Sequence, residues 1–179
     1  MSKIICSKHD ILLLKTNTNQ YNITMKTKKT PKLNLDELTS IKIYDLMKKL
    51  NEDIFEDILI TNQKDKNEAD ILMLFKQFGK ELGIGKKYLF VHTKKTTNDN
   101  IIHIDSNSVS KKLELSKNYE EITSNYLELV VKNNEDYIDI NYKFDMNINE
   151  DLPLYMENLI GFLMKKVFYR LKLFIESIY

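Results

Sequence analysis

Residues 153–178 read PLYMENLIGFLMKKVFYRLKLFIESI and predict one long amphipathic helix that packs against a core. Pro153 falls in its first turn, where the missing N–H is harmless. Apolar residues recur at steps of three or four, and polar residues share the opposite, solvated side. The apolar set is Met156, Ile160, Leu163, Val167, Leu171, Phe174 and Ile178, and the polar side holds Asn158, Gly161, Lys165, Tyr169, Lys172 and Glu176. The charges leave no uncharged stretch long enough for a membrane span.

The apolar arc of this helix is wider than one packing surface requires. Surplus apolar surface on a helix flank often marks contact with a partner protein or with a second copy of the chain. The alternative is that other helices of the same chain cover this flank. The residues predicted to form such an interface are Phe162, Phe168, Leu173, Ile175 and Tyr179.

The stretch before the helix predicts a β-hairpin. Residues 126–144 read YLELVVKNNEDYIDINYKF, in which apolar and polar residues alternate on both sides of a polar loop at 133–136. Pairing Lys132 with Tyr137 aligns the two apolar sets. These sets are Leu127, Leu129 and Val131 on the first strand, and Ile138, Ile140, Tyr142 and Phe144 on the second.

Two more hairpins are predicted from the same alternation. The first pairs residues 11–15 with 20–26 and places Leu12 opposite Ile23, so that one face is apolar and fixes the register. It also places Leu14 opposite Tyr21. The second pairs residues 87–94 with 101–105 across a polar turn. Its inward face holds Leu89, Val91, Ile102 and Ile104.

Two shorter helices are also predicted. Asn34 is placed to cap the first helix, with Glu37 at the third helical position as in a capping box. Residues 53–60 fit either a continuation of this helix or a strand. The second helix is expected to begin near Asn67 and to end at Gly83. Its expected buried residues are Ile71, Leu74, Phe75, Phe78 and Leu82.

These elements predict a single α+β domain over residues 1–179. About three β-hairpins would form an antiparallel sheet, with the helices packed on one face and the long helix at the C-terminal end. In outline this arrangement resembles helix-grip or profilin-like layouts. Such a likeness of layout carries no function by itself.

The bulk composition favours a folded intracellular protein. Hydrophobic residues make up 42% and charged residues 30% of the 179 residues, which is typical neither of disordered chains nor of membrane proteins. The formal net charge of +1 shows no basic excess of the kind that nucleic-acid binders carry. Cys6 is the one cysteine, and the first residues lack the apolar run of a signal peptide. We therefore expect a cytoplasmic location.

The choice of residues points to an AT-rich genome. Arg170 is the one arginine and Ala69 the one alanine, whereas lysine, asparagine and isoleucine are abundant. This texture resembles that of small proteins of nucleocytoplasmic large DNA viruses. The resemblance implies a viral protein located in the host cytoplasm or in the virion.

The second hairpin presents a candidate metal site. The alternation that turns its apolar residues inward sends His92, His103 and Asp105 to the opposite face. Depending on the turn, His92 would stand opposite His103 or opposite Asp105. Two imidazoles and a carboxylate can bind zinc, or act as a general base and its orienting acid. The alternative is that these side chains are simply solvated.

The same region presents a candidate nucleic-acid surface. Lysines that alternate with exposed aromatic side chains can follow a phosphate backbone and stack on bases. The residues concerned are Lys87, Tyr88, Phe90, Lys94 and Lys95. The low net charge and the genome-wide excess of lysine favour an ordinary solvated surface instead.

No motif in the sequence specifies a reaction. A Gly-rich phosphate loop and a nucleophile elbow are both missing, and no cofactor is implied. The leading hypothesis is therefore a non-enzymatic interaction or assembly subunit, with a protein partner or self-association into an oligomer. The alternatives are a nucleic-acid-binding accessory protein and a metal-dependent enzyme at His92, His103 and Asp105.

Overall fold

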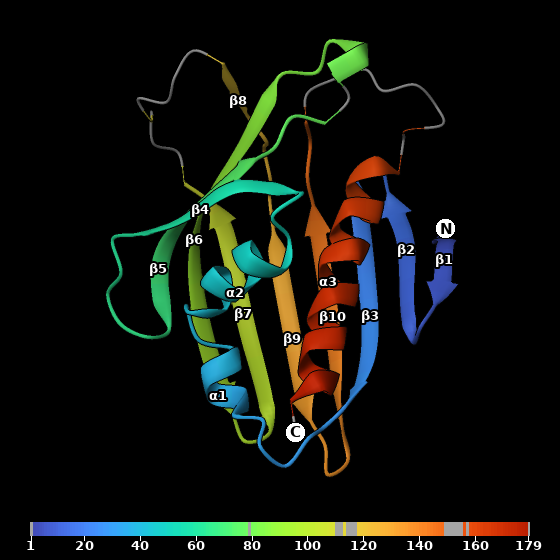
Figure 1. The fold of residues 1–179 in the computed structure, drawn as a ribbon, viewed down its shortest axis with the longest axis vertical. Helices are drawn as coiled ribbons and strands as arrows, with labels where there is room; N and C mark the ends of the chain where they lie inside the picture. Colours follow the sequence, from blue (N-terminus) through green and yellow to red (C-terminus); the bar gives the residue numbers. More distant parts are fainter. Residues whose placement is uncertain are drawn as a thin grey trace.

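The computed structural model describes residues 2–78, 80–109, 113, 118–148, 156 and 158–178 (Figure 1). Within these residues ten strands form one sheet in the order β1-β2-β3-β10-β9-β7-β6-β5-β4, and β8 pairs with β6 in parallel. The strands are β1 (Lys3–Lys8), β2 (Ile11–Asn17), β3 (Gln20–Lys28), β4 (Phe55–Thr61), β5 (Glu68–Phe75), β6 (Lys86–Asn98), β7 (Ile101–Ser108), β8 (Tyr119–Glu121), β9 (Leu127–Asn133) and β10 (Tyr137–Asp145). The helices are α1 (Leu35–Leu38), α2 (Ile43–Leu50) and α3 (Leu159–Ser177), with a 3-10 turn at Lys80–Leu82.

The helices lie in front of the sheet in the view of Figure 1. Helix α3 crosses β3 and β10, and α1 and α2 lie over the half of the sheet that contains β7. The predicted α+β class, with a large antiparallel sheet and a C-terminal helix, is confirmed. The prediction of three hairpins with helices on one face is only roughly right, because β1, β4, β5 and β8 lie outside those hairpins.

The first predicted hairpin forms, but its register is wrong by one residue. Leu13 pairs with Ile23, and Lys15 pairs with Tyr21. The turn is shorter than predicted because Asn17 pairs with Gln20 and Asn19 takes a positive φ of 56°. A slip of one residue exchanges the two faces of a strand. The buried residues are therefore Ile11, Leu13, Tyr21, Ile23 and Met25.

The other two hairpins have the predicted inward faces. In β6–β7, Leu89, Val91, Ile102 and Ile104 are buried as predicted. In β9–β10 the pairing is shifted by two residues, so that Val131 meets Ile140. A shift of two residues preserves the faces, which is why the inward set is right although the register is wrong.

The cap of the first helix is confirmed, but the helix is short. Asn34 Oδ1 accepts a hydrogen bond from the Glu37 backbone N–H at 3.2 Å. The Thr39 and Ser40 hydroxyls then donate to the carbonyls of Leu35 and Glu37, each at 2.7 Å. These bonds satisfy carbonyls at the end of α1. The chain turns before α2 begins, and the undecided stretch 53–60 contains the start of strand β4.

The predicted helix from Asn67 is wrong, because residues 68–75 form strand β5. This strand lies between β4 and β6 and is buried on both faces, with Ala69, Ile71 and Met73 on one face and Leu72 on the other. A strand buried on both faces is almost continuously apolar, so its pattern also fits a helical period. Gly83, with φ of 78°, follows the 3-10 turn instead of ending an α-helix.

Helix α3 is observed from Leu159, and the predicted start at Pro153 lies outside the described residues. Gly161 and Lys172, both predicted on the solvated side, are buried. A Cβ at Gly161 would lie 2.8 Å from Tyr21 Cε1, so α3 approaches β3 closely there. Across the described residues, none of the helices has the length and apolarity needed to span a membrane.

Candidate functional site

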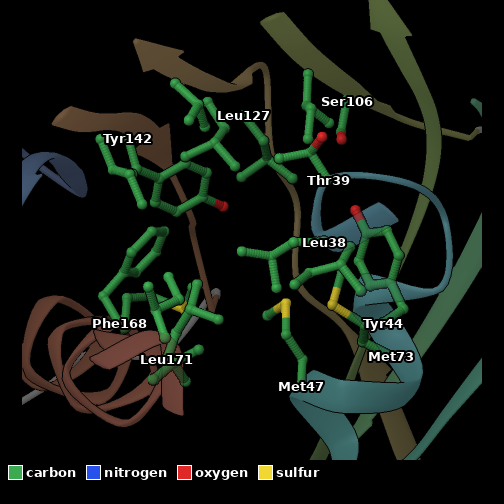
Figure 2. Close-up of a pocket in the computed structure, with 18 of the residues that line it drawn as sticks. Leu38, Thr39, Tyr44, Met47, Met73, Ser106, Leu127, Tyr142, Phe168 and Leu171 are labelled. Carbon is green, nitrogen blue, oxygen red and sulfur yellow. The ribbon is translucent and has the colours of Figure 1, made fainter. Parts of the chain in front are cut away.

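A cavity of about 90 Å³ lies between α3, the α1–α2 segment and the sheet (Figure 2). Inward-facing residues of β4, β5, β7, β9 and β10 form its floor, because alternation along each strand sends every second side chain to this side. Successive turns of α3 form the opposite wall. The α3 residues that line it are Met164, Val167, Phe168, Leu171 and Ile175.

The lining is apolar apart from four hydroxyl groups. Among the described residues none of its side chains is charged. The hydroxyls belong to Thr39, Tyr44, Ser106 and Tyr142. An apolar concave site with a few polar groups is the usual form of a small-molecule site.

Three of these hydroxyls already have protein partners. Thr39 Oγ1 donates to the Leu35 carbonyl at 2.7 Å. The Tyr44 hydroxyl lies 3.2 Å from Thr93 Oγ1, which lies 2.8 Å from Ser106 Oγ. Removal from water raises the pKa of Tyr44, so its hydroxyl stays protonated within this chain.

The hydroxyl of Tyr142 points into the space at the centre of Figure 2. Its ring lies against Phe144 and Phe168, with centroid distances of 4.8 and 5.1 Å. It has no hydrogen-bond partner within the part of the chain that the structure describes. Removal from water raises its pKa far above the ordinary value, and the neighbouring Tyr44 adds to this shift.

Methionine supplies much of the deformable part of the wall. Met47, Met73, Met146 and Met164 all line the cavity. The unbranched thioether side chain changes shape at low energy and fills irregular spaces. The lining can therefore repack around a bound molecule.

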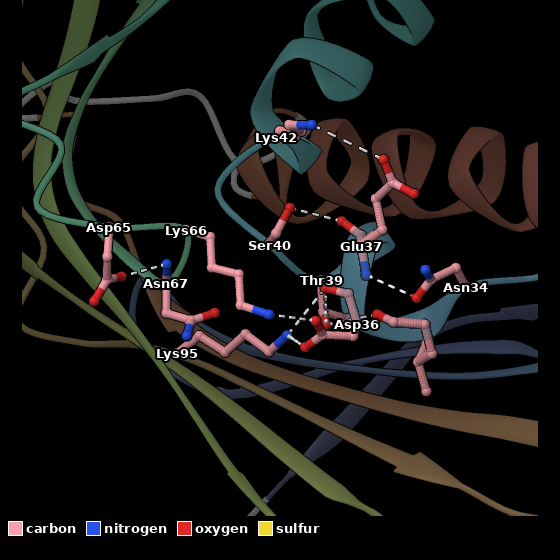
Figure 3. A network of polar contacts seen from close by, with 11 residues as sticks. Asn34, Asp36, Glu37, Thr39, Ser40, Lys42, Asp65, Lys66, Asn67 and Lys95 are labelled. Carbon is pink, nitrogen blue, oxygen red and sulfur yellow. Dashed lines mark hydrogen bonds and ion pairs between the residues drawn. The ribbon is translucent and has the colours of Figure 1, made fainter.

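A polar network holds α1 in place at one wall of the cavity (Figure 3). Lys95 Nζ lies 2.6 Å from Asp36 Oδ1 and 3.0 Å from the Asp36 carbonyl, and Lys66 Nζ lies 2.8 Å from Asp36 Oδ2. These two ammonium groups lower the pKa of Asp36 to about 2, with the hydrogen bond from Lys66 as the largest cause. The network fixes the segment that carries Leu38 and Thr39 into the cavity.

Helix α3 is held at both of its edges. On the β3 side the buried Lys172 donates to the Lys26 carbonyl at 2.6 Å and lies 3.2 Å from both Asp10 and Glu176. On the α2 side Asp53 pairs with Lys166 at 2.6 Å and with Arg170. Hydrogen bonds from Arg170 and Lys166 lower the pKa of Asp53 well below its usual range.

The candidate metal site does not assemble. In the β6–β7 register His92 pairs with Asn107, His103 with Thr96 and Asp105 with Lys94, so the predicted register is wrong. The strand continues to Asn98 before a tight turn, which separates the two histidines along the hairpin. His92 Nδ1 instead lies 2.7 Å from Asp70 Oδ1 on β5. No group of three or more potential metal ligands occurs in the described ranges.

The candidate nucleic-acid surface is largely buried. Lys87 and Lys95 are both buried, Lys87 against Glu120 and Lys95 against Asp36. Phe90 is buried as well, and Tyr88 is partly buried. Lys94 is the one exposed member of the five predicted residues.

The candidate interface on the last helix is divided. Phe168 and Ile175 are buried and line the cavity, so they pack inside this chain and do not form a surface for a partner. Phe162 and Leu173 are 47% and 48% exposed. Tyr179 lies outside the described residues.

Three solved structures are similar to this chain over almost its whole length. Human StAR-related lipid transfer protein 5 has a TM-score of 0.79 at 10% identity, with 98% of this chain and 86% of that chain covered. The STAR-related lipid transfer protein (fragment 25–204) from Xanthomonas axonopodis has a TM-score of 0.73 at 10% identity, covering 98% and 99%. The lipid transfer and protein localization domain of human StarD13 also scores 0.73, at 9% identity, covering 99% and 90%.

This chain has the fold of the StAR-related lipid-transfer domains. At about one identical residue in ten, the likeness shows the fold alone. No protein-family model and no curated protein matches the sequence.

These structural neighbours contradict the function expected from the sequence. The hypothesis of an interaction or assembly subunit, with nucleic-acid binding as an alternative, is wrong, because the neighbours are lipid-transfer domains. The alternative of a metal-dependent enzyme lacks its predicted site, since His92, His103 and Asp105 are not brought together. The sequence reading missed the four hydroxyls of the cavity. Tyr142 carried the available signal, since a tyrosine on an otherwise apolar inward face has a polar group to satisfy.

Proposed function

We propose that this chain binds a lipid in the cavity beneath α3 and carries it between membranes. The observation that carries the proposal is the cavity itself, which lies inside the fold, is lined by apolar side chains and is free of charged ones among the described residues. Such a space offers an acyl chain or a ring system the removal from water that drives its transfer out of an aqueous phase. The fold likeness to lipid-transfer domains supports the same reading.

The cavity must enlarge to hold a lipid. Its volume of about 90 Å³ is below the range of roughly 300–1,000 Å³ usual for ligand pockets. The four methionines can change rotamer, and α3 is tied to the turn that follows α2 by ion pairs of the exposed Asp53. We infer that a ligand enters as the lining repacks and α3 moves relative to α2.

A binding assay with a cavity-filling variant tests this proposal. The protein is incubated with radiolabelled membrane lipids, separated from the vesicles, and the bound lipid is extracted and counted. Leu129 lines the cavity from β9, so Leu129→Phe places extra volume inside it and should reduce the bound lipid by about tenfold.

The matched control is Leu59→Phe, which makes the same change at an exposed position of β4. This variant should bind as much lipid as the wild type. Wild-type protein that extracts no lipid from any vesicle, or equal binding by Leu129→Phe with an unchanged melting temperature, would contradict the proposal.

A further inference from the structure

One of the four cavity hydroxyls differs from the others. Thr39, Tyr44 and Ser106 lie within hydrogen-bond distance of protein oxygens. The Tyr142 hydroxyl has no such partner in the described part of the chain, and it points into the cavity. A hydroxyl that faces an apolar cavity without a protein partner gains a hydrogen bond when a ligand oxygen reaches it, so such an oxygen is favoured there.

The cavity offers nothing to neutralise a charged ligand. The described lining residues include no lysine, arginine, histidine, aspartate or glutamate. Lys95, the buried cation behind α1, is already bonded to the side chain and the carbonyl of Asp36. A phosphate or carboxylate inside would lose its hydration and gain no counter-charge, which is strongly unfavourable.

Building on the lipid-binding function above, we propose that the cavity selects lipids whose polar end is an uncharged oxygen group, and that Tyr142 is the residue that binds this group. A hydroxyl, ester or ketone oxygen meets the requirement. Fatty alcohols, acylglycerols and sterols share this chemistry. Lipids that must bring a charged head group inside are rejected.

The direction of the hydrogen bond depends on the ligand group, because a neutral phenol can donate and accept. The raised pKa of Tyr142 keeps its proton in place at physiological pH. Tyr142 therefore donates to an ester or ketone oxygen, which can only accept, whereas a ligand hydroxyl can also donate to the phenol oxygen. The ring itself is fixed by Phe144 and Phe168, so the donor is already oriented when the ligand arrives.

Three probes with the same hydrocarbon chain length test the selectivity. Oleyl alcohol carries a neutral hydroxyl, oleate carries a charge at pH 8, and octadecene carries no polar end. Binding is measured by titration calorimetry from a cyclodextrin complex. We expect oleyl alcohol to bind about five- to tenfold more tightly than octadecene, the equivalent of one hydrogen bond, and oleate to bind more weakly than the alcohol.

The variant Tyr142→Phe removes the hydroxyl and keeps the ring. Its affinity for oleyl alcohol should fall to that for octadecene, whereas its affinity for octadecene should equal that of the wild type. The matched control is Tyr88→Phe, which removes a hydroxyl from a partly buried tyrosine of β6 that does not line the cavity. The control should keep the preference for the alcohol.

The outcomes separate the two proposals. Oleate binding as tightly as oleyl alcohol would overturn the selectivity, and an unchanged alcohol preference in Tyr142→Phe would overturn the role of Tyr142, while lipid binding stood in both cases. Failure of every probe and of the vesicle assay would remove the binding function, and this inference with it. If Tyr142→Phe does not fold, the ranking of the three probes with the wild-type protein still tests the selectivity for an uncharged oxygen group. Dioleoylglycerol and a fluorescent sterol, compared in the same way, distinguish the source of the neutral oxygen.

Discussion

Gly161 shows how one atom sets the position of a helix. Alanine is normally the better residue inside a helix, by about 1 kcal/mol. Here the extra Cβ would lie 2.8 and 2.9 Å from two ring carbons of Tyr21. That ring is buried and stacked on Phe144 at a centroid distance of 5.4 Å, so it has no free space to move into.

We expect Gly161→Ala to destabilise the protein by about 1–3 kcal/mol, although alanine has the higher helix propensity. Urea unfolding followed by circular dichroism measures the change. The double variant Gly161→Ala with Tyr21→Leu removes the ring that clashes, and the alanine should then cost less than it does in the wild-type background. A stabilising effect of the single variant would show that α3 does not lie this close to β3.

Asp36 makes the stability of the folded protein depend on pH in the acid range. Its pKa in the folded state is about 2, below the ordinary value of 3.8, because Lys66 and Lys95 donate hydrogen bonds to it. A carboxyl with a lowered folded pKa stabilises the protein above its unfolded pKa, and this contribution is lost as the pH falls toward the folded pKa. The window for Asp36 therefore lies between about pH 4 and pH 2.

We expect Asp36→Asn to lower the free energy of unfolding by about 1–3 kcal/mol at pH 7, between the values typical of exposed and of buried ion pairs. The difference from the wild type should shrink as the pH is lowered from 4 to 2. Urea unfolding at a series of pH values measures it. Asp105→Asn, which changes an exposed carboxylate on β7, serves as the control. A difference independent of pH would rule out the ion pairs as the cause.

At the scale of elements, α3 is bound unequally along its two edges. On the β3 side the buried ammonium of Lys172 contacts a backbone carbonyl and two carboxylates. On the α2 side the pairs of Asp53 are partly exposed to solvent, where ion pairs contribute little. The helix is therefore held more firmly to the sheet than to α2.

We expect Lys172→Ala to reduce the free energy of unfolding by about 2–3 kcal/mol, because it leaves the Lys26 carbonyl without its donor and removes buried packing. Asp53→Ala should cost about 1 kcal/mol or less. Denaturant titrations compare the two, with the exposed neighbour Glu52→Ala as the control. A larger loss of unfolding free energy in Asp53→Ala than in Lys172→Ala would show that α3 is held more firmly on the α2 side than on the β3 side.

At the scale of the whole molecule, local sequence patterns predicted helix caps and strand faces better than they predicted how the strands pair. The Asn34 cap and the inward faces of β6, β7, β9 and β10 were right because each depends on residues near in sequence. The registers depended on turn geometry, as at Asn19, whose positive φ shortens the first turn. Strand β5 was misread because a strand buried on both faces loses the alternation that identifies it.

The cavity could not be predicted from the sequence for a related reason. Thr39, Ser106 and Tyr142 come from segments far apart along the chain, and only the sheet order brings them around one space. Lys87 and Lys95 were read as surface because lysine is rarely buried, yet each has a carboxylate partner from a distant segment. The viral origin and the cytoplasmic location stay predictions.

The cavity also has a mechanical consequence. Empty space inside the folded chain disappears when the chain unfolds, so unfolding reduces the total volume by an amount on the order of tens of mL/mol, and hydrostatic pressure favours unfolding. A lipid that fills the space removes most of this reduction. We expect the empty protein to unfold at a lower pressure than the loaded one, with Leu129→Phe in between. Tyrosine fluorescence in a pressure cell measures these midpoints, and equal midpoints would mean that a lipid does not fill this space. By this reasoning the unfolding pressure reports whether the space inside the fold is empty or filled.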